Sequence, residues 1–476
     1  MTTSQKFTAA LIRSARAFRF VSLLCFFLSP LSMSCWSDLP RPLTGVKPER
    51  SAIPKLVIPI DSPSNHPDAP NEALGGAVLR VTTLAGDGPG SLRAALDDPR
   101  PRLVVFEVGG VIDLGGHSLE VRYPYLVLAG QTAPDPGITI IRGELEVATH
   151  DVLIQHLAVR PGDNGHAANW APDALGAHRA AFGPVHHVVF DHCSATWAID
   201  ENLSASGPAD VDPDVDPDVT SHDITFRSCL IAEGLSHATH PKGEHSKGTL
   251  IHDGVRNVVI TGCLYAHNVE RNPRLKGSTT ATVTNNVMYN WANACVGVGT
   301  HGNRKDLMPS RTILAGNIAI AGPDTHTRAF VKAVDPGGMV WLRDNVAVDR
   351  SRAALPMTTA GVMIAGEAPA PPLPPWESFA RVLANAGARP GRRDPIDARI
   401  VQSVRDGTGH IINSQEEVGG YPVRPTTSRA LVVPEGVEGR RGWLEEMGRA
   451  VEGGELNGAS DNSAPEELAD QRQPVI

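Results

Sequence analysis

Cysteine and aromatic side chains are scarce in this sequence of 476 residues. It contains six cysteines, of which Cys25 and Cys35 lie near the N-terminus, and no two cysteines form a Cys-x-x-Cys pair. Six cysteines are too few for a disulfide scaffold of this length, and the missing pair argues against a zinc site built from cysteine. Aromatic residues make up 5% of the chain and hydrophobic residues 41%, so we expect a core of small aliphatic side chains.

Net positive charge and long apolar runs are also missing. The formal net charge of −9 argues against wholesale binding of nucleic acid. The apolar run over residues 20–28 is too short to cross a bilayer comfortably, and basic residues precede it. Small residues follow it up to Ser34, which completes the layout of an export signal. We therefore expect a secreted, periplasmic or cell-surface protein without a stable membrane span. An uncleaved anchor and a lipid anchor at Cys35 are the alternatives.

Composition divides the chain into five segments. Residues 1–35 form the predicted signal peptide, and residues 36–74 are rich in proline and polar residues, as in a linker. We predict a repetitive β-domain over residues 75–360 and a C-terminal extension over residues 361–435 that packs on it. The charged residues 436–476 are predicted to form a flexible tail. We expect a monomer.

A short β-branched segment recurs along the chain and ends each time in a small or polar residue. The residues at the equivalent position are Leu157, Cys193, Cys229, Cys263, Asn286, Asn317 and Asn345. The steps between them vary from 23 residues (Cys263 to Asn286) to 36 residues (Leu157 to Cys193). Variable steps around a constant strand indicate a solenoid whose turns carry loops of different length. A βαβ array would place an amphipathic helix between successive strands, and the sequence shows none.

We therefore predict an all-β chain folded as a right-handed parallel β-helix. Strands stacked about 4.8 Å apart bring like residues above one another. The cysteines then become an interior stack of free thiols, and the asparagines become a hydrogen-bonded ladder at a bend. Short helices are expected at residues 91–96, where one would cap the core, and at residues 376–386 in the C-terminal extension.

An acidic cluster is the first candidate site. Asp173 lies on one predicted turn, and Asp200 and Glu201 lie on the next. Stacking of the turns would bring these carboxylates together on one face, and oxygen ligands suit a hard cation such as Ca²⁺. The sequence has no twelve-residue calcium loop, so the fold itself would have to assemble the site. Solvated surface carboxylates are the alternative.

A basic cluster follows in this acidic chain. Its members are Lys242, His245, Lys247, Arg271, Arg274 and Lys276. Arginine and lysine alternate in a loop that follows a predicted strand, and such a loop can bind sugar carboxylates. A generic exposed basic loop is the alternative. The histidines of this region match no compact zinc pattern, so structural or substrate-contacting roles are favoured.

The order and spacing of several motifs resemble the pectate lyase family of bacteria and fungi. The matching motifs are the strand end Asp191-His192, the pair His245-x-Lys247, the Arg-x-Pro-x-x-basic loop over residues 271–276 and the pair Asn285-Asn286. Residues 88–93, 105–112 and 129–134 resemble the opening turns of bacterial relatives. The similarity extends from about residue 77 to residue 420.

The resemblance implies a calcium-dependent lyase that cleaves polygalacturonate by β-elimination. It implies the following roles: Arg271 as catalytic base; Lys247, Arg274, Lys276 and His245 as substrate-binding residues; Asp173, Asp200 and Glu201 as ligands of Ca²⁺. Two positions depart from the family. Lys276 stands where many relatives have arginine. The family also often places two acids four residues apart, and here Thr196 or Ser204 stands in one of those places.

Two other functions are compatible with the residues. A hydrolase would need a pair of carboxylates flanking the bond, which the acidic cluster could supply, but the Arg271 loop would then have no task. A non-catalytic exported protein would bind polygalacturonate without cleaving it. Ultraviolet absorbance of an unsaturated product separates the lyase from both.

Overall fold

The computed structural model describes residues 70–163, 170–178, 183–207, 220–300, 308–335 and 337–453. All of them belong to the compact unit Pro40–Ile476. The predicted export signal, the linker up to residue 69 and the tail beyond residue 453 lie outside the described residues. Within the described residues, no helix combines the length and the apolar composition that crossing a membrane requires.

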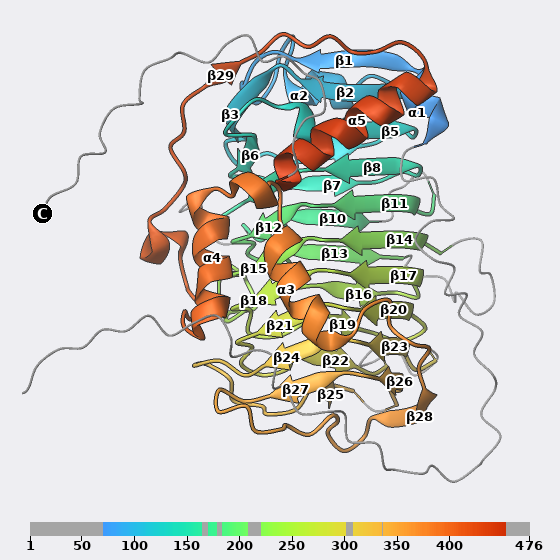
Figure 1. The fold of residues 1–476 in the computed structure, drawn as a ribbon, viewed down its shortest axis with the longest axis vertical. Helices are drawn as coiled ribbons and strands as arrows, with labels where there is room; N and C mark the ends of the chain where they lie inside the picture. The colour runs from blue at the N-terminus through green and yellow to red at the C-terminus, as the bar shows by residue number, and fades with distance from the viewer. Residues whose placement is uncertain are drawn as a thin grey trace, which may run out of the picture. The chain divides into compact units, whose positions relative to one another are not determined.

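Three sheets of parallel strands wind around one hydrophobic core (Figure 1). Neighbouring parallel strands within a sheet are one turn apart in the chain, so a complete turn contributes one strand to each sheet. This arrangement confirms the predicted parallel β-helix. Its coil extends to residue 367, slightly beyond the boundary expected at residue 360.

The largest sheet has eleven strands. In spatial order they are β1 (Ala77–Val81), β2 (Arg102–Phe106), β5 (Leu126–Ala129), β8 (Val152–Gln155), β11 (His186–Asp191), β14 (His222–Arg227), β17 (Arg256–Thr261), β20 (Thr280–Thr284), β23 (Arg311–Ala315), β26 (Met339–Arg343) and β28 (Met363–Glu367).

The second sheet has eight strands and carries the candidate site at the starts of its strands. They are β4 (Leu119–Val121), β7 (Leu145–Val147), β10 (Leu175–His178), β13 (Leu203–Ser206), β16 (Leu250–His252), β19 (Arg274–Leu275), β22 (Val296–Val298) and β25 (Val331–Ala333).

The third sheet has ten strands, nine of them parallel. They are β3 (Val108–Asp113), β6 (Ile138–Ile141), β9 (Leu157–Arg160), β12 (Ser194–Thr196), β15 (Leu230–Ala232), β18 (Leu264–Ala266), β21 (Val287–Tyr289), β24 (Ile318–Ile320), β27 (Val346–Val348) and the antiparallel edge strand β29 (Thr427–Ser428).

Alternation along each strand explains why these segments form a coil. In β14, Ile224 and Phe226 are fully buried while Thr225 between them is partly exposed, as expected for side chains on opposite faces of a strand. The register places Phe226 beside Phe190 of the preceding turn, with ring centroids 5.7 Å apart. Strands inside the stack therefore bury their inward residues against equivalent residues of the turns above and below.

The three cysteines of the repeat lie inside the coil, and so does Cys295. Cys193, Cys229, Cys263 and Cys295 are fully buried and are not disulfide-bonded. The Sγ atom of Cys263 accepts a hydrogen bond from the backbone nitrogen of Cys229, one turn away, at 3.4 Å. The predicted stack of free thiols is confirmed.

The predicted asparagine ladder is also present. The Nδ2 atom of Asn286 donates to Oδ1 of Asn317 at 3.0 Å, and Nδ2 of Asn317 donates to Oδ1 of Asn345 at 2.9 Å. Nδ2 of Asn317 also donates to the carbonyl oxygen of Val283 at 2.8 Å. Each amide thus bonds to the next turn and to the main chain at a bend.

Removal of the central amide should destabilise the coil. We expect Asn317→Ala to lower the free energy of unfolding by about 3 kcal/mol, because it leaves several buried donors and acceptors without partners. Chemical denaturation of the two proteins measures the difference. The exposed Asn413 provides the control: its side chain bonds only to His237 at the surface, where water can replace it, so Asn413→Ala should cost no more than about 1 kcal/mol. Equal losses in both variants would contradict a structural role for the ladder.

Short helices surround the coil. They are α1 (Asn71–Gly75), α2 (Leu92–Leu96), η1 (Gly130–Thr132), α3 (Pro375–Asn385), η3 (Pro390–Arg392), α4 (Pro395–Asp406), η4 (Gln415–Val418) and α5 (Val437–Glu452). The helices expected at residues 91–96 and 376–386 are α2 and α3. Helices α3 and α4 cover the ten-stranded sheet, where Val382 and Ile400 join an apolar cluster with Leu230 (Figure 1).

The chain then returns to the first turns of the coil. Helix α5 contacts α1, η1 and η3, and Leu444 packs with Leu103 and Val127 of the eleven-stranded sheet. The composition of residues 436–476 predicts a flexible tail, whereas residues 437–452 form this helix. The difference arises because Leu444 and Val451 become buried in a contact that local composition does not reveal.

Candidate active site

The candidate residues precede consecutive strands of the eight-stranded sheet. Asp173 comes before β10, Glu201 before β13 and Lys247 before β16. Isolated parallel bridges pair Glu201 with Lys247, and Lys247 with Glu270. Glu201, Lys247 and Glu270 therefore form one column on successive turns. Arg271 directly follows Glu270 in the chain. The coil brings the predicted acidic and basic clusters together at one corner.

The acidic half of the site is rigidly held. One oxygen from each of Asp173, Asp200 and Glu201 lies within 4.8 Å of the others. The Oδ1 atom of Asp173 accepts a hydrogen bond from the backbone nitrogen of Glu201 at 2.9 Å, and its Oδ2 accepts one from the hydroxyl of Ser204. His178 Nε2 lies 3.3 Å from the same Oδ2. Three converging carboxylates form an all-oxygen donor set, which fits a hard divalent cation such as Ca²⁺.

Two imidazoles contact the carboxylate of Asp200. Nε2 of His245 lies 2.5 Å from Oδ1 of Asp200, and Nε2 of His240 lies 3.3 Å from its Oδ2. The two rings stack with centroids 3.8 Å apart and an interplanar angle of 5°. Burial alone would raise the pKa of the Asp200 carboxyl, but His245, His240 and Arg271 together hold it well below its usual range. Asp200 is therefore ionised at neutral pH.

Arg271 joins the acidic half to the basic half. Its Nη1 atom contacts the carboxylate of Glu201 and lies 4.0 Å from Oδ1 of Asp200. Its Nε lies 3.8 Å from Oε1 of Glu270. The side chain is 16% exposed. Burial lowers the pKa of the guanidinium to about 10; Asp200 opposes this shift, and Arg274 adds to it.

Lys247 and Glu270 form an ion pair beside Arg271. Nζ of Lys247 lies 3.0 Å from Oε1 of Glu270, and the lysine side chain is 8% exposed. No motif in the sequence singles out Glu270. The only signal for it lies in the stacking register, because Glu270 is one turn after Lys247 in the same column.

Arg274 and Lys276 complete the basic half. Arg274 is buried in β19, where its Nη2 lies 2.5 Å from Oδ2 of Asp335. Lys276 is half-buried. Burial, followed by the charges of Arg274 and Arg271, lowers the pKa of Lys276 to about 8. The basic side chains thus differ: Arg274 has a carboxylate partner at close range, whereas Lys276 is crowded by cations.

Thr196 and Ser204, the two alternatives for the place of a further acid, lie in different sheets. Thr196 lies in β12 of the ten-stranded sheet, away from the strand starts that carry the cluster. Ser204 lies in β13, and its hydroxyl donates to Asp173. The serine therefore orients the neighbouring carboxylate of Asp173.

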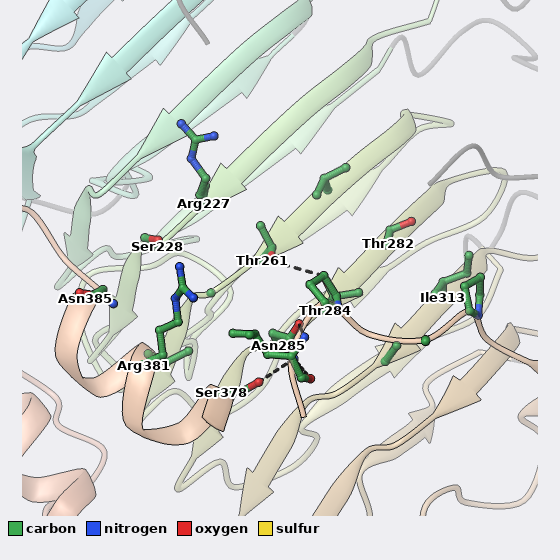
Figure 2. A pocket seen from close by; sticks show the side chains of 18 residues that line it. Arg227, Ser228, Thr261, Thr282, Thr284, Asn285, Ile313, Ser378, Arg381 and Asn385 are labelled. Carbon is green, nitrogen blue, oxygen red and sulfur yellow. Dashed lines mark hydrogen bonds between the residues drawn. The ribbon is translucent and has the colours of Figure 1, made fainter. Parts of the chain in front are cut away.

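A separate cavity of about 500 Å³ lies between the outer face of the eleven-stranded sheet and α3 (Figure 2). Thr261 and Thr284 line it from the sheet, and Arg381 lines it from the helix. None of the predicted site residues lines this cavity. It plays no part in the chemistry considered below.

Comparison with known proteins identifies the family. The protein "Probable pectate lyase C" of Aspergillus flavus is 30% identical over 390 residues, which cover 77% of this chain and 83% of that protein. The chain belongs to the pectate lyase family. The protein of the same name from Aspergillus fumigatus is 33% identical over 258 residues, covering 54% of this chain and 53% of that protein. No model of a protein family matches the chain.

Solved structures of pectate lyases are more distant in sequence. A pectate lyase from Bacillus sp. N165, in complex with trigalacturonate, is 12% identical, with a TM-score of 0.44. The match covers 67% of this chain and 95% of that chain. The cedar pollen allergen jun a 1 is 14% identical with a TM-score of 0.45, covering 66% of this chain and 89% of that chain.

Proposed function

We propose that this chain is a calcium-dependent pectate lyase that cleaves polygalacturonate by β-elimination, with Arg271 as the base. The observation that carries the proposal is the contact between Arg271 and a cluster of three carboxylates. Membership of the pectate lyase family supports the same activity. A hydrolase would use the carboxylates but would leave the adjacent arginine without a task.

β-Elimination removes the proton from C5 of a galacturonate residue and expels the glycosidic oxygen from C4. The C5 proton is only weakly acidic while the neighbouring carboxylate keeps its negative charge. A calcium ion held by Asp173, Asp200 and Glu201 would withdraw charge from that carboxylate and stabilise the enolate-like transition state. Lys247 and Lys276 would add fixed positive charge on the same side.

Arg271 is suited to the base role because burial, with a smaller contribution from the charge of Arg274, lowers the pKa of its guanidinium to about 10. The ordinary arginine pKa of 12.5 leaves roughly 0.003% of the side chain neutral at pH 8, whereas a pKa of about 10 leaves on the order of 1%. The neutral guanidine accepts the C5 proton, and the resulting cation is stabilised by Glu201 and Glu270. A low-abundance base of this kind should favour alkaline conditions.

His245 and His240 act on Asp200 in this proposal. The family resemblance implies substrate contact for His245, but its ring is buried and its Nε2 lies 2.5 Å from Oδ1 of Asp200. We therefore assign it a positioning role, in which the two imidazoles fix the orientation of the carboxylate. His245→Gln should retain the hydrogen bond and a measurable affinity for Ca²⁺, which calorimetry would test; complete loss of that affinity would contradict this assignment.

The pH dependence follows from two of these pKa values. We expect kcat to rise about tenfold per pH unit between pH 7 and pH 9, because the neutral fraction of Arg271 grows as pH approaches its pKa of about 10. KM for polygalacturonate should rise above about pH 8, where Lys276 loses its charge. Initial rates at several substrate concentrations separate the two effects. In Lys276→Arg the charge persists, so the rise in KM should move to higher pH. A kcat that falls steadily above neutrality would exclude Arg271 as the base.

The decisive assay for the reaction class is incubation with polygalacturonate, with and without a chelator. A lyase produces the ultraviolet absorbance of 4,5-unsaturated oligogalacturonides, and the chelator should abolish it. A hydrolase would release reducing ends without that absorbance. A binding protein would release neither product.

The composition of the first 35 residues supports export, and we propose that the enzyme acts as a monomer outside the cytoplasm. Cell fractionation and light scattering of the purified protein test these two points. Recovery of the full-length protein in the cytosol, or a stable dimer at assay concentrations, would contradict them.

A further inference from the structure

A row of stacked histidines lies where the chain passes from the eight-stranded to the eleven-stranded sheet. Arg271, by contrast, lies before the start of β19, at the other end of the strands of the eight-stranded sheet. His150, His186 and His222 precede or begin β8, β11 and β14 on three consecutive turns. Their rings are nearly parallel, with successive centroids 4.6 and 5.0 Å apart. Asp173 precedes β10 and His186 follows β10, so the length of this strand separates the histidine row from the candidate active site.

A second row of residues lies beside the first. It consists of Asp151, His187 and Asp223, which have φ values of 55°, 52° and 54°. A left-handed conformation is uncommon outside glycine, although aspartate and histidine adopt it more readily than most residues, and its repetition over three turns gives the corner a constant shape. Nδ1 of His150 lies 2.7 Å from Oδ2 of Asp151, and Nδ1 of His222 lies 2.6 Å from Oδ2 of Asp223. The two rows therefore form one connected cluster of imidazoles and carboxylates.

The central part of this cluster has the spacing of a metal site. His150, Asp151 and His186 each offer an atom within 4.8 Å of the others. Nδ1 of His186 lies 3.1 Å from Nδ1 of His187, which is itself 3.6 Å from Oδ1 of Asp151. Tetrahedral ligands bound at Zn–N distances of 2.0–2.1 Å are about 3.3 Å apart. Small movements of these partly exposed side chains would bring the donors of His150, Asp151 and His186 to one ion, and His187 adjoins two of these three residues.

We propose that His150, Asp151, His186 and His187 bind a transition-metal ion such as Zn²⁺. Three imidazoles and one carboxylate suit Zn²⁺, Cu²⁺ or Ni²⁺, whereas Ca²⁺ prefers oxygen ligands alone. The site is therefore chemically distinct from the carboxylate cluster at Arg271. A bound ion links the corners of two successive turns, and it stabilises the coil because it binds the folded chain preferentially.

The test uses untagged full-length protein, freed of metal and then saturated with Ca²⁺. Zn²⁺ is titrated calorimetrically into the wild type and into His150→Gln/His186→Gln. The double variant His326→Gln/His410→Gln is the matched control, since both of these histidines are exposed and lie outside the cluster. A third variant, His240→Gln/His245→Gln, removes the imidazoles around Asp200.

We expect the His150/His186 variant to lose at least tenfold in Zn²⁺ affinity at one site and to lose the Zn²⁺-dependent rise in Tm. The control should keep both, and lyase activity with Ca²⁺ should be unchanged in the His150/His186 variant. Equal Zn²⁺ binding by this variant and the control would overturn the proposal, as would loss of binding only in the His240/His245 variant. Anomalous diffraction from Zn²⁺-soaked wild-type crystals locates the ion without any substitution, and an ion elsewhere would also overturn it.

Discussion

Arg271→Lys should reduce turnover about 1,000-fold while leaving the fold and Ca²⁺ affinity intact. Lysine retains a positive charge at neutral pH, but its single nitrogen replaces a planar group that contacts Glu201 and approaches Asp200 and Glu270. A base displaced by about 1 Å from the C5 proton loses on the order of 100-fold by misplacement alone. The loss should appear in kcat, measured by the ultraviolet absorbance of the unsaturated product.

The matched control for this substitution is Arg381→Lys. Arg381 is exposed on α3 and lines the separate cavity, so the same chemical change there should leave kcat within about twofold. Thermal unfolding and calorimetric Ca²⁺ titration establish that both variants are intact. Substantial turnover by folded Arg271→Lys would remove Arg271 from the base role and favour a mechanism in which another group takes the proton.

Asp173→Asn should weaken Ca²⁺ binding on the order of 100-fold, because affinity in oxygen sites depends strongly on the number of charged ligands. The amide keeps an oxygen that can accept the hydrogen bond from the backbone nitrogen of Glu201. Folding should therefore persist. Activity should be lost at low Ca²⁺ and recovered in part at high Ca²⁺, and isothermal calorimetry should show the same change in affinity directly.

Glu120→Gln is the control for that charge change. Glu120 lies in β4, two strands from β10 in the same sheet, and forms an ion pair with Arg122. Its substitution should leave Ca²⁺ affinity unchanged within about twofold. If both variants lost affinity equally, a diffuse acidic surface rather than the cluster around Asp173 would hold the cation.

Much of the fold could be predicted because its stabilising contacts recur along the chain. The residues Asn286, Asn317 and Asn345 occupy equivalent places in successive repeats, and the ladder between them follows from stacking alone. The burial of Cys193, Cys229 and Cys263 follows in the same way. Helix α5 could not be predicted similarly, because its contact with the first turns joins segments more than 300 residues apart and leaves no local pattern.

The candidate site was predictable only in part. Arg271, Lys247 and the acids were recognisable from motifs, and the structure brings them to one corner. Glu270 and the two-histidine support of Asp200 were not recognised, since no spacing rule connects residues 45 positions apart, as Asp200 and His245 are. Ser204 illustrates a further limit. Its residue type suggests a missing ligand, whereas its hydrogen bond gives it a task beside Asp173.

The amino-acid sequence by itself determined that this chain coils, because short β-branched strands at each turn can bury their inward side chains only against neighbouring copies of the same pattern. It also determined which chemical groups are available at each turn. Tertiary structure alone decided which groups meet, because the loops between strands differ in length and the strand register sets the column that each residue joins. Arg271 and Glu201 are 70 positions apart, and only the register places them in contact.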